Sequence, residues 1–356
     1  MAKKLMKGCE AIAEAAIQAG CRFFFGYPIT PQNDIPEYMS ARMPQVEGGC
    51  FLQAESEVAA INMVYGAAGA GARVMTSSSS PGISLKMEGI SYIAGAELPC
   101  VIVNMMRGGP GLGSIQASQG DYFQATKGGG HGDYRMVVYA PSSVQEAVDL
   151  VQRAFDVADT YRMPVMVLAD GIIGQMMEPV EVKTVVPKPC DKSWATTGYR
   201  KSESNAPRSI VNSLYIEVEE LEEMNMRLQA RYRDVEAREA QAELYRTEGA
   251  SYILCAYGTV ARICKSAIAL LEKKGIKAGL VRPVTLWPFP SAAVHGAIAA
   301  EGVKKAFCVE MSAGQMVEDI RLAVNGEKRV EMLPYLGSRV PTAEDIVSKI
   351  LEMEGV

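Results

Sequence analysis

Hydrophobic residues in the first half of the chain form short continuous runs that alternate with stretches at helical spacing. The apolar positions of residues 5–19 recur every three or four residues and stop at Gly20, so this stretch predicts a helix. The short apolar runs predict strands at residues 22–25, 51–54, 74–78, 100–106, 136–140 and 163–168. Residues 56–72 and 83–94 predict helices between them. Apolar strands alternating with helices predict a doubly wound parallel α/β domain over residues 1–185.

A capping signal opens a further helix in this half. Ser143 followed by Glu146 forms a capping-box pattern, in which each side chain bonds the other residue's backbone N–H. Val144, Val148 and Phe155 follow at helical spacing. These features predict a helix that packs one apolar face against the sheet.

The composition changes between residues 186 and 249. Pro and Ser residues mark a loop, and the charge-dense stretch 214–245 then predicts a long helix. Its apolar residues at helical spacing are Leu221, Met224, Leu228, Tyr232 and Val235. A single apolar stripe fits two interpretations, a contact for a partner subunit or a largely solvated helix lying on its own domain. The sequence leaves both open.

Strand and helix patterns resume after Gly249. Residues 252–256, 278–282 and 306–310 predict strands, and residues 260–274 and 343–354 predict helices. The same alternation as in the first half therefore predicts a second, smaller α/β domain over residues 250–356.

Charge and hydropathy exclude two classes of partner. Lys and Arg total 36 and Asp and Glu total 41, a formal net charge of −5, so no positive excess is available for a nucleic-acid backbone. The apolar run 98–106 is about half the ~20 residues that a membrane-spanning helix needs, and the start lacks a signal-peptide pattern. We expect no nucleic-acid partner, no membrane span and a cytoplasmic location.

The 8 cysteines never occur as Cys-x-x-Cys, and several lie inside apolar runs. Such spacing argues against an iron–sulfur or zinc framework and predicts buried free thiols instead. We therefore expect no metal ligands on this chain, and any electron carrier must lie on another polypeptide.

Glycine and histidine motifs exclude several enzyme classes. The Gly-Pro-Gly-Leu-Gly stretch at 109–113 lacks the following helix and downstream acid of a dinucleotide turn, and a Gly-Lys-Ser/Thr P-loop is absent. A Gly-x-Ser-x-Gly nucleophile motif, with which one of the two histidines could act, is also absent. His295 is interpreted as structural. His131, within the glycine-rich stretch 128–132, either contacts a ligand from a mobile loop or only belongs to that loop.

Residues 53–57, Gln-Ala-Glu-Ser-Glu, place two carboxylates at a strand-to-helix transition, where ligands collect in parallel sheets. An acid there also favours the helix dipole, and Ser56 or Glu57 could serve that role alone. The small apolar helix that follows would desolvate Glu57, however. A desolvated glutamate holds its proton more strongly and can exchange it with a heteroaromatic nitrogen.

Four stretches together carry a family resemblance: Gly-Tyr-Pro-Ile-Thr-Pro at 26–31, Glu-Ser-Glu at 55–57, Thr-Ser-Ser-Ser-Ser-Pro-Gly at 76–82 and Arg-Gly-Gly-Pro-Gly at 107–111. With them, nearly the whole chain resembles the alpha subunit of 2-oxoacid:ferredoxin oxidoreductases. The runs 107–113 and 127–134 look closest to the branched-chain, 2-oxoisovalerate type.

The resemblance implies a thiamine diphosphate pyrimidine-binding-type domain over residues 1–185 and a transketolase C-terminal-like domain over residues 250–356. It implies that Glu57 is catalytic and hydrogen-bonds N1′ of the aminopyrimidine, which favours the tautomer that activates the cofactor. Thr30 and Arg107 match substrate-facing positions, and a guanidinium suits a 2-oxoacid carboxylate. The residues implied to contact the cofactor are Tyr27, Pro28, Ile29, Thr30, Glu57 and Ser79.

The family's Gly-Asp-Gly…Asn motif for magnesium and diphosphate is missing, because Ala-Asp-Gly at 169–171 lacks a matching Asn and Asp170 reads as a strand-end acid. The resemblance then implies that Mg²⁺ and the diphosphate are bound by a beta subunit. Iron–sulfur clusters would lie on partner chains, among them a gamma subunit and a ferredoxin-like subunit. The complex would oxidise 2-oxoisovalerate with coenzyme A and reduce ferredoxin, and this chain alone would be inert. The alternatives are a 2-oxoglutarate-specific alpha subunit and a non-catalytic scaffold subunit.

Overall fold

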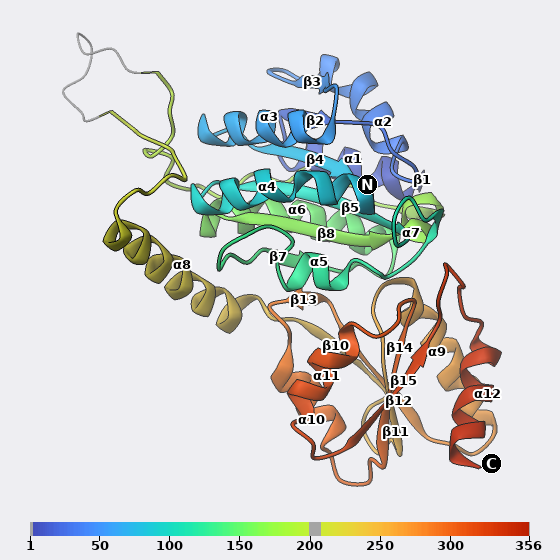
Figure 1. The fold of residues 1–356 in the computed structure, drawn as a ribbon. Coiled ribbons are helices and arrows are strands. Elements are labelled where there is room, and N and C mark those ends of the chain that lie inside the picture. The colour runs from blue at the N-terminus through green and yellow to red at the C-terminus, as the bar shows by residue number, and fades with distance from the viewer. Residues whose placement is uncertain (1–2, 199–207, 356) are drawn as a thin grey trace.

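The computed structural model describes residues 3–198 and 208–355, which form two α/β units (Figure 1). The first unit contains an eight-stranded sheet in the order β13-β7-β8-β5-β4-β2-β3, with β6 paired to β5. Its strands are β2 (Phe23–Gly26), β3 (Cys50–Gln53), β4 (Val74–Ser78), β5 (Cys100–Gly108), β6 (Ser114–Ala117), β7 (Val137–Tyr139), β8 (Pro164–Asp170) and β13 (Thr285–Trp287). The six strands from β7 to β3 run parallel, which confirms the predicted sheet type.

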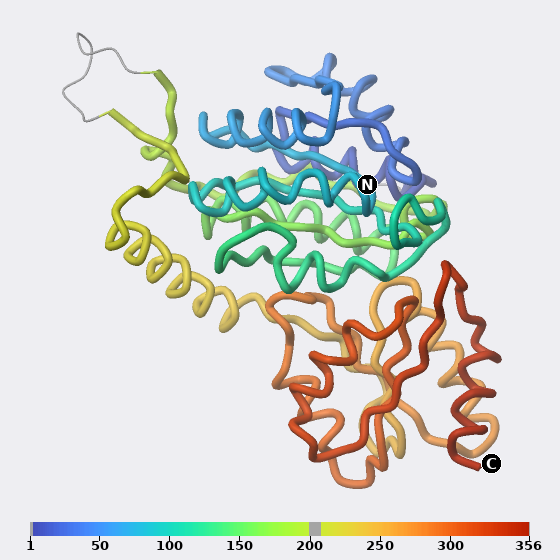
Figure 2. Tube along the Cα trace, viewed as in Figure 1, coloured from blue at the N-terminus to red at the C-terminus, as the bar shows by residue number. Residues whose placement is uncertain are grey.

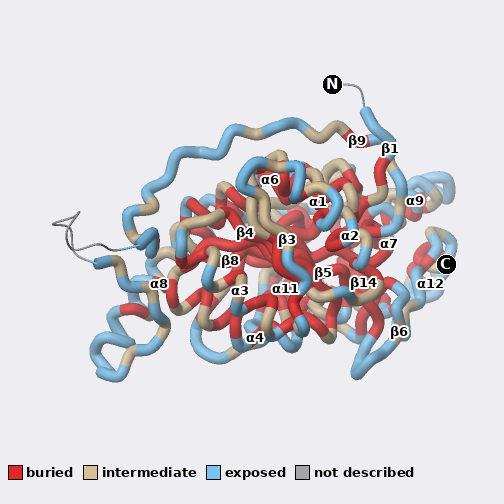
Figure 3. Tube along the Cα trace, turned by 90° about the horizontal axis from the view of Figure 1, so that it is seen from above, coloured by how far each residue is buried: buried red, intermediate tan, exposed pale blue. Residues whose placement is uncertain are grey.

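Helices cover both faces of this sheet (Figure 3). Helices α1 (Gly8–Gln18) and α6 (Val144–Tyr161) pack together on one face, and α3 (Glu57–Gly69) and α4 (Ser80–Gly95) pack together on the other. Strands β4, β5 and β8 are buried along their whole length, as expected for a doubly wound sheet.

The predicted capping box of α6 is half right. Ser143 Oγ accepts a hydrogen bond from the Glu146 backbone N–H at 3.1 Å, which caps the helix. The Glu146 carboxylate bonds the backbone N–H of Ser142 at 2.7 Å rather than that of Ser143. It also pairs with Arg282 at 2.7 Å, so a contact with a distant strand redirects it.

The prediction of one helix over residues 5–19 is wrong at its start. Strand β1 (Lys4–Lys7) pairs antiparallel with β9 (Met177–Val180), and α1 begins only at Gly8. A side chain at Gly8 would meet the Ile173 carbonyl oxygen at 1.8 Å, so this close backbone approach requires glycine. The pattern also missed short elements: α2 (Asp34–Arg42), the 3₁₀ turn Met43–Gln45, α5 (Tyr122–Thr126) and α7 (Gly171–Gln175).

The long charged helix is shorter than predicted. Helix α8 runs from Val218 to Glu239, the segment before it is irregular, and residues 242–245 form strand β10 (Ala242–Tyr245). Met224, Leu228, Tyr232 and Val235 are buried as expected, whereas Leu221 is exposed. Arg227 and Arg231 of α8 form ion pairs with Glu97 of the first unit, so α8 packs against the first unit of its own chain. Figure 2 shows how α8 leads the chain from the first unit to the second.

The second unit contains a five-stranded sheet in the order β10-β12-β11-β14-β15. Four of its strands run parallel to one another: β11 (Tyr252–Cys255), β12 (Ala278–Pro283), β14 (Lys305–Glu310) and β15 (Arg329–Pro334). Strand β10 pairs antiparallel with β12 at the edge. Helices α9 (Gly258–Lys273) and α12 (Ala343–Glu354) pack together, as do α10 (Ser291–Ile298) and α11 (Met316–Val324). Strand β13 follows β12 along the chain but pairs antiparallel with β7. The segment after β12 therefore supplies an edge strand of the first sheet.

Buried hydrogen bonds join the two units. Asp170 accepts from the Thr259 backbone N–H at 2.9 Å and from its hydroxyl at 2.7 Å, and it also caps α7. The Tyr122 hydroxyl donates to Asp319 at 2.5 Å. The side-chain oxygen of Gln119 accepts from the Met311 backbone N–H at 3.0 Å. Asp170 therefore has the structural role that its position at a strand end indicated.

Six of the eight cysteines are buried free thiols, as predicted, while Cys50 is half-buried and Cys190 is exposed. Burial raises the pKa of Cys21 and Cys100 to about 12, which keeps both as inert thiols. Within the described ranges, no cluster of three His, Cys, Asp or Glu side chains is placed to hold a metal ion.

Candidate functional site

The candidate residues from four separate motifs meet at one edge of the first sheet. Thr30 lies in the loop after β2, Glu57 opens α3 directly after β3, Ser79 follows β4, and Arg107 is near the end of β5. Strands β2, β3, β4 and β5 are parallel, so their carboxyl ends lie at the same edge. That edge is where ligands bind in open α/β sheets.

Glu57 is buried, with 6% of its surface exposed, and its carboxylate has no hydrogen-bond partner among the residues that the structure describes. The adjacent Ser56 is the N-cap of α3 and accepts from the Ala59 backbone N–H at 3.1 Å. Helix capping therefore does not explain Glu57. A Cβ atom at Gly82 would lie 2.7 Å from Glu57 Oε1, so glycine in α4 makes room for this carboxylate.

Hydroxyl groups without partners lie along the end of β4 and directly after it. Thr76 Oγ1, Ser78 Oγ and Ser79 Oγ are buried and lack hydrogen-bond partners in the described part of the chain. Ser78 Oγ and Glu57 Oε1 both crowd the position that a Gly82 side chain would take. Buried polar groups are almost always satisfied, so orphaned groups in one place indicate a polar ligand or partner chain.

Arg107 links two loops beside this point. Its Nη1 donates to the Thr30 carbonyl and its Nη2 donates to the Leu112 carbonyl, each at 3.0 Å. The buried Nε has no partner among the described residues. Arg107 as a whole residue is 8% exposed, and its guanidinium keeps donors free for a planar anion such as a carboxylate.

A cavity of about 360 Å³ adjoins these loops, lined by Thr30, Pro31, Asn33, Asp34, Ile115, Gln116 and Gln175. The Thr30 hydroxyl accepts a hydrogen bond of 3.4 Å from the Asn33 amide. Leu112, at the tip of the neighbouring glycine-rich loop, is 82% exposed. An apolar loop tip beside a guanidinium suits a ligand with a carboxylate and a hydrocarbon part.

A buried polar network, not anticipated from the sequence, holds the start of α4 against β5. Asp121 accepts from the Ser80 hydroxyl at 2.6 Å and from the Asn104 amide at 2.9 Å. Ser80 Oγ also accepts from the Arg107 backbone N–H at 3.0 Å. Burial raises the pKa of Asp121, although both hydrogen bonds oppose the shift. The polar Asn104 inside an apolar strand was the one available signal for this network.

The remaining predicted site residues are less closely joined to this group. Tyr27 and Ile29 are half-buried and Pro28 is exposed in the loop after β2, where the Tyr27 carbonyl accepts from Gln32 at 3.2 Å. His131 is exposed, and its Nδ1 lies 3.4 Å from Ser91 Oγ in the second half of α4. His131 thus has no hydrogen bond or ion pair to the described site residues.

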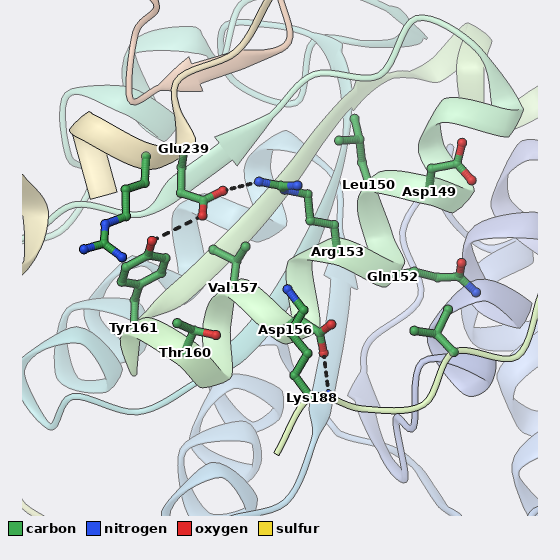
Figure 4. A pocket seen from close by; sticks show the side chains of 12 residues that line it. Asp149, Leu150, Gln152, Arg153, Asp156, Val157, Thr160, Tyr161, Lys188 and Glu239 are labelled. Carbon is green, nitrogen blue, oxygen red and sulfur yellow. Dashed lines mark hydrogen bonds and ion pairs between the residues drawn. The ribbon is translucent and has the colours of Figure 1, made fainter. Parts of the chain in front are cut away.

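A groove of about 660 Å³ on the outer face of α6 is a different kind of feature (Figure 4). Glu239 at the end of α8 accepts from Arg153 at 2.6 Å and from the Tyr161 hydroxyl at 3.2 Å. Lys188, in the segment that crosses α6, donates its backbone N–H to Asp156 at 3.4 Å. These polar groups pair with one another and hold α8 and the crossing segment, so we assign the groove a structural role.

Two family models match the chain. The model described as "Pyruvate flavodoxin/ferredoxin oxidoreductase, thiamine diP-bdg" matches residues 14–244, which is more than half of the chain. The model described as "Pyruvate:ferredoxin oxidoreductase core domain II" matches residues 250–346. The described helices include none that is long and apolar enough to cross a membrane.

Relatives match over the full length. The ketoisovalerate oxidoreductase subunit VorB of Methanothermobacter thermautotrophicus is 49% identical and is matched over 100% of this chain and 99% of its own length. The 2-oxoglutarate synthase subunit KorA of the same organism is 37% identical, with 98% of both chains covered.

Solved structures agree with the fold. A 2-oxoglutarate:ferredoxin oxidoreductase from Magnetococcus marinus, with 2-oxoglutarate, coenzyme A and succinyl-CoA bound, matches with a TM-score of 0.84 and 26% identity. The match covers 98% of this chain but 65% of that chain, so this protein spans about two thirds of that relative's length. A split-gene transketolase is similar in fold only, with a TM-score of 0.61 and 13% identity.

Proposed function

This chain belongs to the 2-oxoacid:ferredoxin oxidoreductase family, and on that premise we propose that it is the alpha subunit of a branched-chain member. The complex would oxidise 2-oxoisovalerate with coenzyme A to an acyl-CoA and CO₂, and would pass the two electrons to ferredoxin. The identity of 49% to a ketoisovalerate oxidoreductase subunit, against 37% to a 2-oxoglutarate synthase subunit, supports the branched-chain substrate over 2-oxoglutarate.

One observation carries the catalytic assignment. Glu57 is a buried carboxylate without a hydrogen-bond partner among the described residues, and the orphaned hydroxyls of Ser78 and Ser79 lie at the same sheet edge. An acceptor and several hydroxyls fit the ring nitrogens and amino group of an aminopyrimidine. A buried carboxylate that accepts no hydrogen bond within the described chain is costly, and a ligand that donates to it would offset that cost, which favours a binding site over a scaffold without chemistry.

The cofactor would be thiamine diphosphate, shared with a partner chain. When bound, it supplies the carbanion chemistry that cleaves a 2-oxoacid. Tyr27, Pro28, Ile29, Thr30, Glu57 and Ser79 would hold it on this side. We propose that Mg²⁺ and the diphosphate are bound by a beta subunit, and that a gamma subunit and a ferredoxin-like iron–sulfur subunit complete the complex. The cytoplasmic location expected from the sequence stays a prediction.

This chain's own residues would perform three tasks. Glu57 would hold a proton at its carboxylate, facing the pyrimidine ring. Arg107 would bind the substrate carboxylate through its free donors while its other two donors keep the flanking loops in place. Thr30, whose carbonyl Arg107 already binds, would face the substrate from the neighbouring loop. His131 is proposed as a ligand contact from its loop.

The test is a Glu57→Gln substitution in the anaerobically purified complex. We expect coenzyme-A-dependent reduction of ferredoxin with 2-oxoisovalerate to fall at least about 100-fold, because the amide cannot exchange the proton. Glu55→Gln is the matched control, since Glu55 is exposed two residues away.

Parallel assays with 2-oxoglutarate and pyruvate test the substrate. Preference for either would overturn the branched-chain assignment and keep the mechanism. Unchanged oxidation by Glu57→Gln would sink the catalytic assignment and favour the scaffold interpretation.

A further inference from the structure

Lys86, in the middle of α4, is a buried cation beside the candidate catalytic acid. Its side chain is fully buried, with a relative exposure of 0%. Its Nζ makes a single hydrogen bond within the described residues, a 3.4 Å contact to the backbone carbonyl of Glu57. An ammonium group has three donors, so this site satisfies it poorly. Lysine is almost never fully buried without a charged partner.

Helix packing explains how the lysine reaches this position. Gly82 and Gly89 lie one turn before and about one turn after Lys86 on α4. A Cβ atom at Gly82 would crowd Glu57, and one at Gly89 would lie 2.4 Å from Ile61 of α3. The two glycines therefore bring α4 close to α3 on either side, and Lys86 fills the space between them next to Glu57.

Other charged groups nearby are engaged elsewhere. Glu88 on α4 accepts from the Tyr92 hydroxyl at 2.6 Å, and Asp121 bonds Ser80 and Asn104. His131, from the loop packed on α4, contacts Ser91. Glu57 is thus the charged group that acts on the ammonium. Burial lowers the pKa of Lys86 to about 8, and the charge of Glu57 opposes that shift.

We propose that Lys86 is a positioning residue that holds Glu57 at the start of α3, through the hydrogen bond to its backbone carbonyl, and so keeps its carboxylate oriented toward the pyrimidine ring of the cofactor. The inference rests on the proposed function for its catalytic consequence, but the pairing of Lys86 with Glu57 stands on this chain alone. The Glu57 carbonyl is the one hydrogen-bond acceptor of this ammonium among the described residues, so a neutral residue in the same space would release the first turn of α3. Lys86 has no hydrogen bond or ion pair to the candidate substrate loops in the described part of the chain, so it would act through Glu57.

A double-mutant cycle tests the pairing without any assay of activity. Lys86→Met, Glu57→Gln and the double variant are compared by thermal unfolding of the full-length chain, with Lys86→Gln as a second neutral variant. Each single change leaves one buried group without its partner. We therefore expect the double variant to lose clearly less in thermal midpoint than the sum of the two single losses. Additive losses would overturn the pairing.

The kinetics of the complex test the positioning role. Without Lys86, the Glu57 carboxylate is no longer held toward the cofactor, so kcat should fall about 10-fold or more in Lys86→Met. The KM for the 2-oxoacid should change less than threefold. Lys265→Met, which removes a half-buried lysine paired with Glu243 in the second unit, should leave kcat unchanged.

The results separate this inference from the proposed function. A kcat that does not fall in either Lys86 variant would refute the positioning role. If the complex oxidises none of the 2-oxoacids, the proposed function fails, while the thermal cycle still decides whether Lys86 and Glu57 are coupled.

Discussion

Replacement of Arg107 by lysine separates substrate binding from loop bracing. In the structure, two donors of Arg107 hold the Thr30 and Leu112 carbonyls at 3.0 Å, and Nε is buried without a partner among the described residues. Lysine keeps the charge but not the planar, forked set of donors. It would lose the paired contact to a carboxylate and at least one of the two loop bonds.

The expected size follows from the bonds that are lost. A hydrogen bond to a charged group contributes about 1.5–3 kcal/mol, and 1.4 kcal/mol corresponds to a factor of about ten in affinity. Loss of one of the two bonds to the substrate carboxylate should raise KM for 2-oxoisovalerate about 30-fold. Because this contact is present in the ground state as well, kcat should change far less. Arg107→Met removes the charge too, and its KM should rise at least about 100-fold.

The assay is the substrate dependence of ferredoxin reduction by the purified complex, alongside the thermal midpoint of each variant. Arg22 is the matched control, because its Nη1 donates to the Ile17 carbonyl at 3.3 Å and the Cys21 carbonyl at 2.9 Å away from the site. Arg22→Lys should lower the midpoint without changing KM. If Arg107→Lys behaves in the same way, with KM within threefold of the unmodified complex, Arg107 is only a loop brace and the reasoning fails.

Two further predictions concern the fold around the site. Burial raises the pKa of Glu97, but hydrogen bonds from Arg227 and Arg231 outweigh it, so the pKa lies below its ordinary value. The ion pairs of Glu97 therefore stabilise the docking of α8 above about pH 4.5, and this contribution is lost as the pH falls below that value. Hydrogen exchange of the α8 backbone amides would detect the loss. Glu97→Gln should loosen α8 already at pH 7, and unchanged protection of α8 in this variant would contradict the prediction. Asp170→Asn leaves one acceptor oxygen in place of two, so either the buried Thr259 backbone N–H or the N–H groups of α7 that Asp170 caps lose their acceptor. Stability in denaturant unfolding should fall by about 1–3 kcal/mol, and an unchanged midpoint would show that these bonds contribute little.

Local patterns in the sequence determined the class of fold and the place of the candidate site. Strand β4 (Val74–Ser78) and helix α12 (Ala343–Glu354) have the bounds that apolar runs and helical spacing predicted. Glu57 and Arg107 lie at the sheet edge expected of residues at strand ends, because parallel strands bring all their carboxyl ends to one edge. The family resemblance is confirmed by matches along most of the chain.

Only the tertiary structure decided the features that depend on distant contacts. The first residues of the predicted helix became β1 because β9, far along the chain, offers a strand to pair with. Likewise, β13 crosses to the first sheet to pair with β7.

The same limit explains why Lys86 was missed. A lysine in a helix pattern is normally solvent-exposed, and here it is buried because two glycines let α4 approach α3. Periodicity reports which face of an element is apolar, but pairing partners, helix spacing and the ionic surroundings of Glu57 depend on contacts between residues far apart in the sequence. Those contacts exist only once the chain has folded.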